Sequence, residues 1–304
     1  MDNAAAMMTA HDDPGMPDPE SAPAQDPTRQ LPVTVLQGPL FLTESVDTVA
    51  EEVPVALVYN GLAHAVMMAS PTDLEDFAVG FSLSEGVLNS AEELLDFDCQ
   101  VETTVDGRVG LTLMLSITTR RMVLLKERRR TLAGRTGCGL CGRERLEDAM
   151  RPPTPLDPEH EAGWPRLNRD ALGRAVNELS QRQILQALTG ACHAAAWCRP
   201  DGTIDLLRED VGRHNALDKL IGALARRRQD QDDETSEPGF VLITSRASYE
   251  MVHKAATAGM PVLAAISAPT ALAVRTACDA GLTLIGFARG QRAVVYAHPQ
   301  RLQD

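Results

Sequence analysis

The sequence predicts an α/β protein with a mixed sheet, flanking helices and a β-rich N-terminal part. In the second half of the chain, short apolar runs alternate with amphipathic segments of helical length. In the first half, two tight-turn dipeptides each separate a pair of alternating apolar segments. Apolar strands separated by helices of this length indicate crossover connections, and therefore a parallel or mixed sheet.

The chain divides into three predicted regions. Residues 1–31 are rich in proline and acidic residues and poor in large aliphatic side chains, which predicts a disordered tail that cannot offset the entropy of ordering. Residues 32–150 form the β-rich N-terminal part, which ends in a CxxC loop. Residues 151–304 open with a proline-rich connector and form the α/β part.

In the N-terminal part, we expect a β-hairpin that turns at Asn60-Gly61, a dipeptide favoured in two-residue hairpin loops. A helix follows, because apolar residues recur at helical spacing until Gly86 supplies a stop signal. The next alternating segments predict a second hairpin, with its turn at Asp106-Gly107.

In the α/β part, we expect an amphipathic helix, a strand-turn-strand unit and a second helix, followed by an acidic loop. The remainder alternates between buried strands and helices. The predicted strands are residues 239–245, 261–267 and 282–288, and the predicted helices are about 247–259 and 269–280.

Charge and composition exclude several classes of protein. A net charge of −13 argues against a general nucleic-acid or membrane-surface binder, because a large negative field repels phosphates. We find no apolar run long enough for a membrane helix and no secretory signal. Six cysteines in 304 residues are too sparse for a disulfide scaffold and fit a reducing cytoplasm.

The strongest chemical feature is the CxxC pair Cys138 and Cys141. The pair lies among glycines, with Arg135 and Arg143 on either side and a charged helical segment after it. Nearby cations and the start of a helix both stabilise a thiolate, and the thiolate is the nucleophilic form of cysteine. The residues therefore favour an activated thiol, such as a persulfide carrier.

Three other interpretations of the CxxC pair stay open: buried structural thiols, a thioredoxin-like dithiol and half of a zinc site. A structural zinc needs four ligands, and the other candidates, Cys192, His193 and Cys198, do not have the spacing of a standard half-site. We therefore expect no metal.

A second group of residues predicts an anion site. Ser245 and Arg246 follow a buried strand and open a helix, and Ser267 holds the matching place one strand later. Backbone N–H groups at helix starts and an arginine suit a phosphate at this edge of an α/β sheet, although each turn alone could be a simple helix cap. His214 and Asn215 lie in a charged segment that is either a solvated helix start or part of the same site.

Several stretches occur in the order typical of one family: "FAVGFSLSEGVL", "GCGLCG", "EDVGRHNALDKLIG", "SRASYEMVHKAATAGMPVLAAISAPTALAV" and "GFARG". From about residue 33 to its end, the chain resembles the formate dehydrogenase accessory sulfurtransferase family, FdhD. The resemblance implies a cytidine-deaminase-like α/β fold and a cytoplasmic homodimer. It also implies a carrier that accepts persulfide sulfur from a cysteine desulfurase. The recipient would be the molybdenum- or tungsten-bis-molybdopterin guanine dinucleotide of the formate dehydrogenase catalytic subunit.

The resemblance also assigns roles to residues. Cys138 matches the persulfide-bearing cysteine and Cys141 its partner. The segment that matches the family's cofactor-binding stretch, which would hold guanine dinucleotide or GDP as its fragment, consists of Phe287, Ala288, Arg289, Gly290, Gln291 and Arg292. One departure is Ala191-Cys192, where the family has a Gly-Thr pair before a histidine.

Two other functions remain as alternatives. A zinc-dependent, deaminase-like hydrolase would need a glutamate at the position of Val66 and a proline at that of Gly137, so the catalytic acid/base is missing. A non-catalytic chaperone of the molybdenum cofactor would keep the anion site without needing the thiols.

Overall fold

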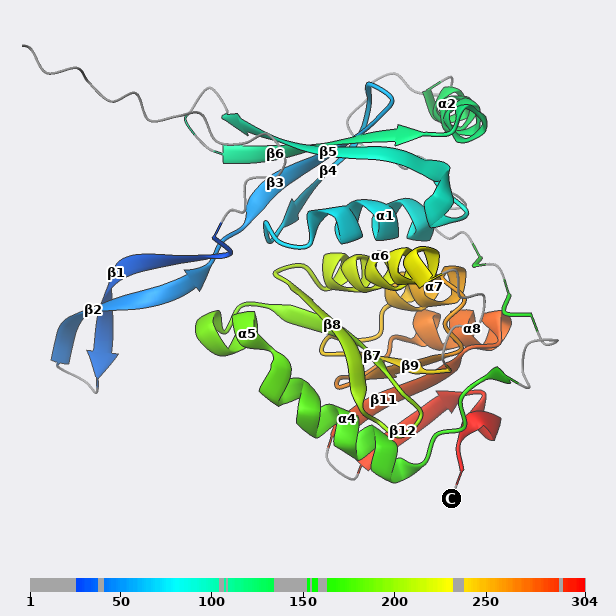
Figure 1. The fold of residues 1–304 in the computed structure, drawn as a ribbon. Helices are drawn as coiled ribbons and strands as arrows, with labels where there is room; N and C mark the ends of the chain where they lie inside the picture. Colours follow the sequence, from blue (N-terminus) through cyan, green and yellow to red (C-terminus); the bar gives the residue numbers. More distant parts are fainter. Residues whose placement is uncertain are drawn as a thin grey trace, which may run out of the picture.

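The computed structural model describes residues 26–37, 41–103, 107, 109–133, 152–153, 155–157, 163–231, 238–289 and 292–303. Its strands form a two-stranded, a four-stranded and a six-stranded sheet, with helices packed between and beneath the two larger ones (Figure 1). The predicted α/β class with mixed sheets is confirmed.

The four-stranded sheet belongs to the N-terminal part and has the strand order β4-β3-β6-β5. Both predicted hairpins are present, and positive φ angles at Asn60 (45°) and Gly61 (78°) give the first one its tight turn. Alternate residues of β3 are buried against helix α1, which covers one face of the sheet. The elements are β3 (Val53–Tyr59), β4 (Leu62–Ala69), α1 (Leu74–Ser84), η1 (Ala91–Glu93), β5 (Leu94–Thr103), β6 (Val109–Ile117) and α2 (Thr119–Ala133).

The six-stranded sheet has the order β12-β11-β10-β9-β7-β8. Its centre, β9, β10 and β11, is parallel, while β12 on one side and β7 and β8 on the other are antiparallel to their neighbours. The sequence did not predict β12. The strands are β7 (His193–Cys198), β8 (Ile204–Asp210), β9 (Phe240–Ile243), β10 (Val262–Ala265), β11 (Thr283–Arg289) and β12 (Arg292–Ala297).

Helices cover both faces of this sheet. The helices α6, α7 and α8 bury one face in an aliphatic core, and α4 buries the other (Figure 1). Few aromatic residues take part in either core. The helices are α4 (Arg169–Arg182), α5 (Ile184–Thr189), α6 (Arg213–Gln231), α7 (Tyr249–Thr257) and α8 (Ala271–Ala280), with a terminal turn η3 (Pro299–Arg301).

The two parts of the chain meet where α1 crosses α6 at backbone contact distance. A Cβ atom added at Gly80 would lie 1.7 Å from the Asp218 carbonyl oxygen, and one added at Gly222 would lie 1.9 Å from that of Asp76. Only glycine permits this approach. Two ion pairs join the two parts here, Arg208–Asp76 and Arg226–Asp76, both at 2.7 Å. The Ser84 hydroxyl of α1 also donates to Asp218 of α6 at 2.7 Å, and Lys254 pairs with the same carboxylate at 3.0 Å.

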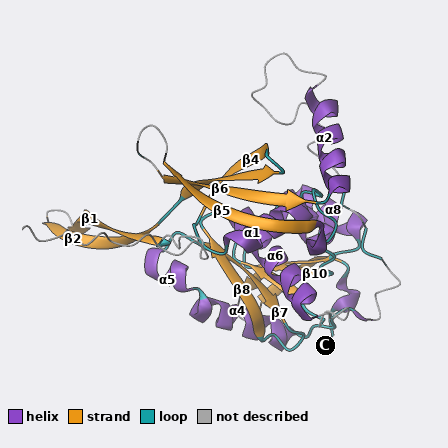
Figure 2. Ribbon diagram, turned by 45° about the horizontal axis from the view of Figure 1, so that its top comes forward, coloured by secondary structure: helices purple, strands orange, loops and turns teal. Residues whose placement is uncertain are grey.

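The two-stranded sheet, β1 (Thr28–Gln37) and β2 (Phe41–Ala50), projects from the body as an arm (Figures 1 and 2). The base of β2 lies beside α5. The arm moves the end of the predicted tail, because β1 already begins at Thr28 and pairs with β2 along its whole length. Residues 1–25 of the predicted tail lie outside the described residues.

Among the described residues, the structure contains no helix that is both long and apolar enough to span a membrane.

Candidate functional site

The predicted anion-binding residues converge on one edge of the six-stranded sheet. Parallel β9, β10 and β11 all end there, so the turns that follow them bring Ser245 and Arg246, Ser267, and the segment from Phe287 together. Antiparallel β7 begins at this edge with His193, and antiparallel β8 ends there and leads into the first turn of α6, which contains His214. Ligands of open α/β sheets bind at this kind of edge.

Backbone hydrogen bonds tie these turns to one another. The Ile266 amide donates to Ile243 O, the Thr270 amide to Ala247 O, and the Phe287 amide to Ser267 O, at 3.0–3.1 Å. These three amides are therefore not available to a phosphate, and the predicted role of the N–H groups at the start of α7 stays a prediction. The interlocked turns instead give the edge a rigid backbone.

The two helix starts at this edge differ. At α8, the Thr270 hydroxyl accepts from the Ala273 amide, so this turn is a simple helix cap. At α7, Ser248 makes no capping bond, and among the described residues its buried Oγ has no partner. Ser245 is buried and donates to the carbonyl oxygen of Arg246. The unsatisfied hydroxyl of Ser248 is the group that a ligand at the α7 start would meet.

Three arginines supply positive charge to the edge. Arg246, Arg289 and Arg292 are all exposed, and the Nε of Arg289 donates to Ile266 O at 3.0 Å, which holds its guanidinium beside the β10 turn. The Arg292 guanidinium lies 5.8 Å from the centre of the Phe287 ring. Gly290 and Gln291 lie outside the described residues.

Phe287 itself has a left-handed backbone with φ of 52°, at an irregularity in the β11–β12 pairing. A bulky residue in this region is strained, and such strain occurs preferentially at binding and catalytic sites. Ala288, next to it, is buried in the core between the six-stranded sheet and α4, so its side chain cannot face a ligand.

One ring nitrogen of His214 has a hydrogen-bond partner, and the other has none among the described residues. Its Nε2 lies 3.1 Å from a carboxylate oxygen of Glu250, and its buried Nδ1 has no partner within the described part of the chain. Burial lowers the pKa of His214, and the Glu250 carboxylate opposes this only in part, so the ring is neutral at neutral pH. Because the carboxylate requires a donor, Nε2 carries the proton and Nδ1 is a free acceptor.

The structure corrects the predicted role of Asn215 in the anion site. It is 2% exposed, and its amide donates to Met68 O at 2.7 Å and to Asp210 Oδ1 at 3.0 Å. The side chain fastens the α6 start to the N-terminal part and is not available to a ligand. Asp210, which also pairs with buried Lys219 at 2.7 Å, is the centre of this arrangement.

The structure adds two residues to the edge that the sequence did not assign to the anion site. His193 Nδ1 lies 3.2 Å from the Thr244 hydroxyl. Arg213, the first residue of α6, is close enough to lower the pKa of His193 together with burial. His193 begins antiparallel β7, and Arg213 begins α6 directly after β8. The position of these two strands next to β9 in the sheet depends on contacts between distant segments, which no local sequence pattern indicates.

Cys138 and Cys141 lie outside the described residues, so the structure does not place them. Three of the four described cysteines, Cys99, Cys192 and Cys198, are buried, and burial raises the pKa of each thiol. Cys192 lies beside His193 at the candidate site, but with a raised pKa it is a poor nucleophile. The described residues contain no group of three or more side chains suited to hold a metal ion.

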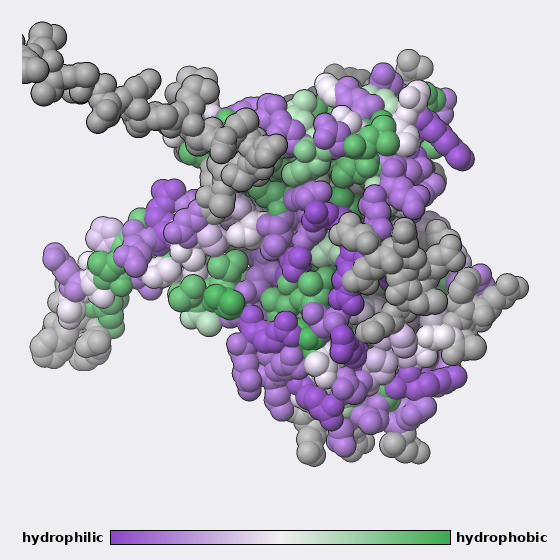
Figure 3. All heavy atoms as spheres, viewed as in Figure 1, coloured by the Kyte–Doolittle hydropathy of each residue, from purple (hydrophilic) through white to green (hydrophobic). Residues whose placement is uncertain are grey.

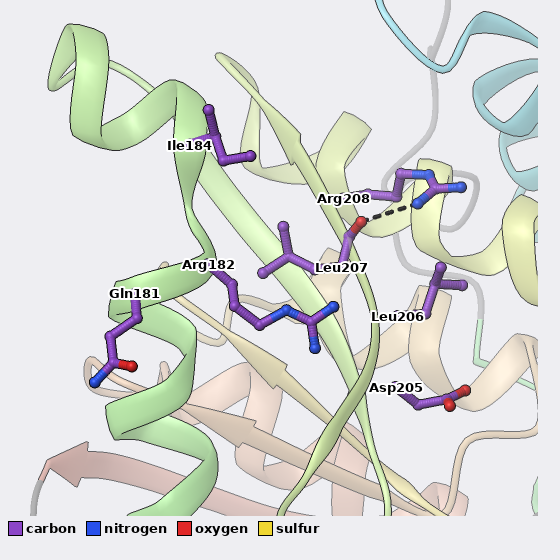
Figure 4. A pocket seen from close by; sticks show the side chains of 7 residues that line it. All are labelled: Gln181, Arg182, Ile184, Asp205, Leu206, Leu207 and Arg208. Atoms are coloured by element: carbon purple, nitrogen blue, oxygen red, sulfur yellow. Dashed lines mark hydrogen bonds between the residues drawn. The ribbon is translucent and has the colours of Figure 1, made fainter.

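A groove of about 410 Å³ lies elsewhere, between the α4–α5 junction and strand β8 (Figure 4). None of the predicted site residues lines it. Its walls are Gln181, Arg182, Ile184, Asp205, Leu206, Leu207 and Arg208.

The chain is similar to known proteins over most of its length. The sequence model of the FdhD/NarQ family matches residues 50–303. A protein from Cupriavidus necator named sulfur carrier protein FdhD is 55% identical over 267 residues, which cover 88% of this chain and 87% of the relative. A protein of the same name from Xanthomonas euvesicatoria is 54% identical over 256 residues, 84% of this chain and 86% of the relative.

The fold also has a counterpart among solved structures. A crystal structure from Desulfotalea psychrophila, described as a formate dehydrogenase accessory protein, matches with a TM-score of 0.64. The match covers 91% of this chain and 99% of the other at 23% identity, so it shows the fold alone. The two close relatives and the family match over most of the chain together show that this protein belongs to the FdhD/NarQ family.

Proposed function

We propose that this protein is a sulfurtransferase that carries sulfur as a persulfide on Cys138. It receives the sulfur from a cysteine desulfurase and passes it to the bis-molybdopterin guanine dinucleotide of formate dehydrogenase. The observation that carries the nucleotide half of this proposal is the sheet edge, where Arg246, Arg289 and Arg292 gather on a protein of net charge −13. Its close relatives, named sulfur carrier proteins, support the sulfur half.

The loading step is a thiol–persulfide exchange. The Cys138 thiolate attacks the outer sulfur of the desulfurase persulfide, a new S–S bond forms on Cys138, and the desulfurase cysteine leaves as a thiolate. No external oxidant is needed, because the sulfur moves at constant oxidation state. Arg135 and Arg143 favour the attacking thiolate, and Cys141 is the neighbouring thiol that can accept or release the same sulfur.

The guanine dinucleotide is the substrate that the edge suits. Exposed guanidinium groups bind diphosphate by charge-assisted hydrogen bonds, which overcome the repulsive field of the acidic protein locally. The unpartnered acceptor Nδ1 of His214 and the hydroxyl of Ser248 fit a ligand that also brings N–H or O–H donors. Guanine and ribose both carry such donors.

The same proposal places the protein in the cytoplasm as a homodimer that meets two other proteins, the desulfurase and the catalytic subunit of formate dehydrogenase. The name of the Desulfotalea psychrophila structure supports the second of these partners. The sparse cysteines of the chain support the reducing compartment.

Mass spectrometry tests the sulfur half. After incubation with a desulfurase and cysteine, the intact protein should carry one additional sulfur atom, and Cys138→Ala should carry none. Cys278→Ala removes an exposed cysteine of α8 and serves as the matched control, which should load like the wild type. Full loading of the Cys138 variant would refute the proposed acceptor. Undiminished activation of formate dehydrogenase by that variant would favour the cofactor-chaperone function instead.

Calorimetry with GDP tests the nucleotide half. Arg289→Ala should weaken GDP binding about ten-fold or more, because a charge-assisted hydrogen bond contributes about 1.5–3 kcal/mol. Arg199→Ala is the matched control: Arg199 follows the opposite end of β7, its side chain is half exposed, and its loss should leave GDP binding unchanged. Equal affinities of Arg289→Ala and wild type would move the site away from this edge.

A further inference from the structure

The positive charge of this acidic protein is concentrated in one stretch of the chain. Residues 119–145 contain nine of the 29 lysines and arginines but two of the 42 acidic residues. The first 15 residues of this stretch form helix α2, whose sequence holds six cations and one acid, Glu127. On a chain with a net charge of −13, such a stretch attracts acidic partners that the rest of the surface repels.

Helix α2 is fixed to the body along one side and projects from it (Figure 2). Met122 and Leu125 are buried in the core of the N-terminal part. Arg121 is 7% exposed, and its guanidinium donates to the carbonyl oxygens of Gly86 and Val87 at 2.7 and 2.6 Å. These contacts determine which side of the helix faces outwards.

The outward side of α2 combines apolar side chains with cations. Val123 is 49% exposed and Leu124 is 44% exposed, and Arg120 and Lys126, three or four residues away from them, are exposed as well. Figure 3 shows mostly hydrophilic side chains over α2, with a small apolar area among them. A small apolar centre with a charged rim is typical of a protein–protein interface. We call these four residues the α2 surface.

The chain connects the α2 surface directly to the proposed sulfur acceptor. Helix α2 ends at Ala133, and Cys138 follows five residues later. Five residues span at most about 18 Å when they are fully extended. A protein whose cysteine reaches Cys138 must therefore bring its own surface to the region around the end of α2.

We propose that the α2 surface is the docking site of the sulfur donor, and that the donor presents an acidic surface around its persulfide cysteine. The inference rests on the proposed function, in which a cysteine desulfurase is the donor, and adds the surface that receives it. The sulfur of the donor is attached to a protein side chain, so its transfer requires protein–protein contact near Cys138. The recipient nucleotide has its own proposed site at the sheet edge and does not need α2.

The composition of the α2 surface suits a donor that binds and then leaves. Attraction between opposite charges accelerates the encounter of two proteins, whereas a small apolar contact adds little to the lifetime of the complex. A carrier must release its donor before it passes the sulfur to a second protein. Fast binding with a short lifetime therefore fits the task of a carrier better than a large apolar interface does.

The kinetics of persulfide loading on the full-length protein test the inference. The double variant Arg120→Glu/Lys126→Glu should raise the KM of a desulfurase for this protein at least about ten-fold, because it places like charges opposite each other. Its kcat should stay within about two-fold of the wild type, because docking is lost and the chemical step is not. Leu124→Ser should raise KM about five-fold, since it removes an apolar contact.

Matched control variants carry the same changes elsewhere on the surface. Arg174→Glu/Arg275→Glu alters the net charge equally, at exposed positions of α4 and α8. Ile184→Ser replaces an aliphatic side chain on α5 that is 68% exposed. Both controls should have the KM and kcat of the wild type.

A small persulfide separates docking from the chemistry of the thiol. Glutathione persulfide transfers its outer sulfur to the Cys138 thiolate by the same exchange and leaves as glutathione thiolate, but it needs no protein surface. All variants should load from it at the wild-type rate. Raising NaCl from about 50 to about 500 mM should slow loading from the desulfurase at least about ten-fold, and loading from glutathione persulfide by less than about two-fold.

The two donors make the outcomes distinguishable. An unchanged KM for Arg120→Glu/Lys126→Glu refutes docking at α2 and leaves the sulfur carrier intact. Slow loading of this variant from both donors would show that the cations act on the thiolate, which also refutes docking. Normal loading from the desulfurase with lost binding to formate dehydrogenase would assign α2 to the recipient and overturn the proposal. A wild type that loads from neither donor refutes the proposed function and the inference with it.

Discussion

Replacing Gly222 by alanine tests whether the contact between α1 and α6 joins the two parts of the protein. The new Cβ would lie 1.9 Å from the Asp76 carbonyl oxygen, whereas ordinary contact begins at 3.4 Å, so the helices would have to separate by roughly 1.5 Å. That movement lengthens the Arg226–Asp76 ion pair, which joins the two helices. Overpacking of this kind costs about 1–3 kcal/mol, and we expect a loss of about 2 kcal/mol.

The direction of the stability change in Gly222→Ala distinguishes the helix contact from helix propensity. In a helix without tertiary contacts, the same substitution stabilises by about 0.5–1 kcal/mol, so propensity alone would raise the Tm. We expect a Tm about 4–8 °C below that of the wild type by differential scanning calorimetry. Gly163→Ala is the control, because a Cβ there meets nothing within 4 Å, and its Tm should not fall. An unchanged or higher Tm for Gly222→Ala would show that the close helix contact is not essential.

Two further predictions concern titratable groups near the sheet edge. Burial raises the pKa of Cys192, so iodoacetamide should label it slowly in the native protein while exposed Cys278 reacts quickly, and peptide mass spectrometry would reveal equal rates if this is wrong. Burial lowers the pKa of His214 below its ordinary 6.5, so the unfolded chain takes up a proton before the folded one and stability falls as pH drops below about 6.5. His214→Gln should therefore lose less of its urea midpoint between pH 7.5 and 5.5 than the wild type does, and identical losses would contradict this linkage.

Local chemistry explains which parts of the fold could be predicted. The predicted turn at Asn60-Gly61 is confirmed. It could be predicted because a two-residue hairpin loop requires residues that tolerate positive φ, and Asn-Gly is such a pair. The order of strands could not be predicted, since it depends on contacts between distant segments. Strand β12 was missed because its first residue, Arg292, was assigned to the predicted cofactor segment, and its pairing with β11 is irregular.

Part of the candidate site could be predicted from the topology of a parallel sheet. Three turns that each follow a parallel strand had to meet at one edge, and they do. His214 and Asn215 were grouped because they are adjacent in sequence, yet successive helical residues point about 100° apart. One therefore faces Glu250 and the other faces Asp210. The roles of Cys138 and Cys141 remain predictions.

The crossing of α1 and α6 also affects the protein while the ribosome is still making it. Asp76 on α1 is paired by Arg226, which lies 150 residues later in the chain. At about 5–20 residues per second, synthesis of that stretch lasts roughly 8–30 s. Once β6 has also been made, the four-stranded sheet and α1 are complete for the rest of this interval, but the glycine face of the helix and the Asp76 carboxylate still lack their cover. The first half of the nascent chain must therefore stay soluble without its final partner, which makes it a natural client for chaperones during synthesis.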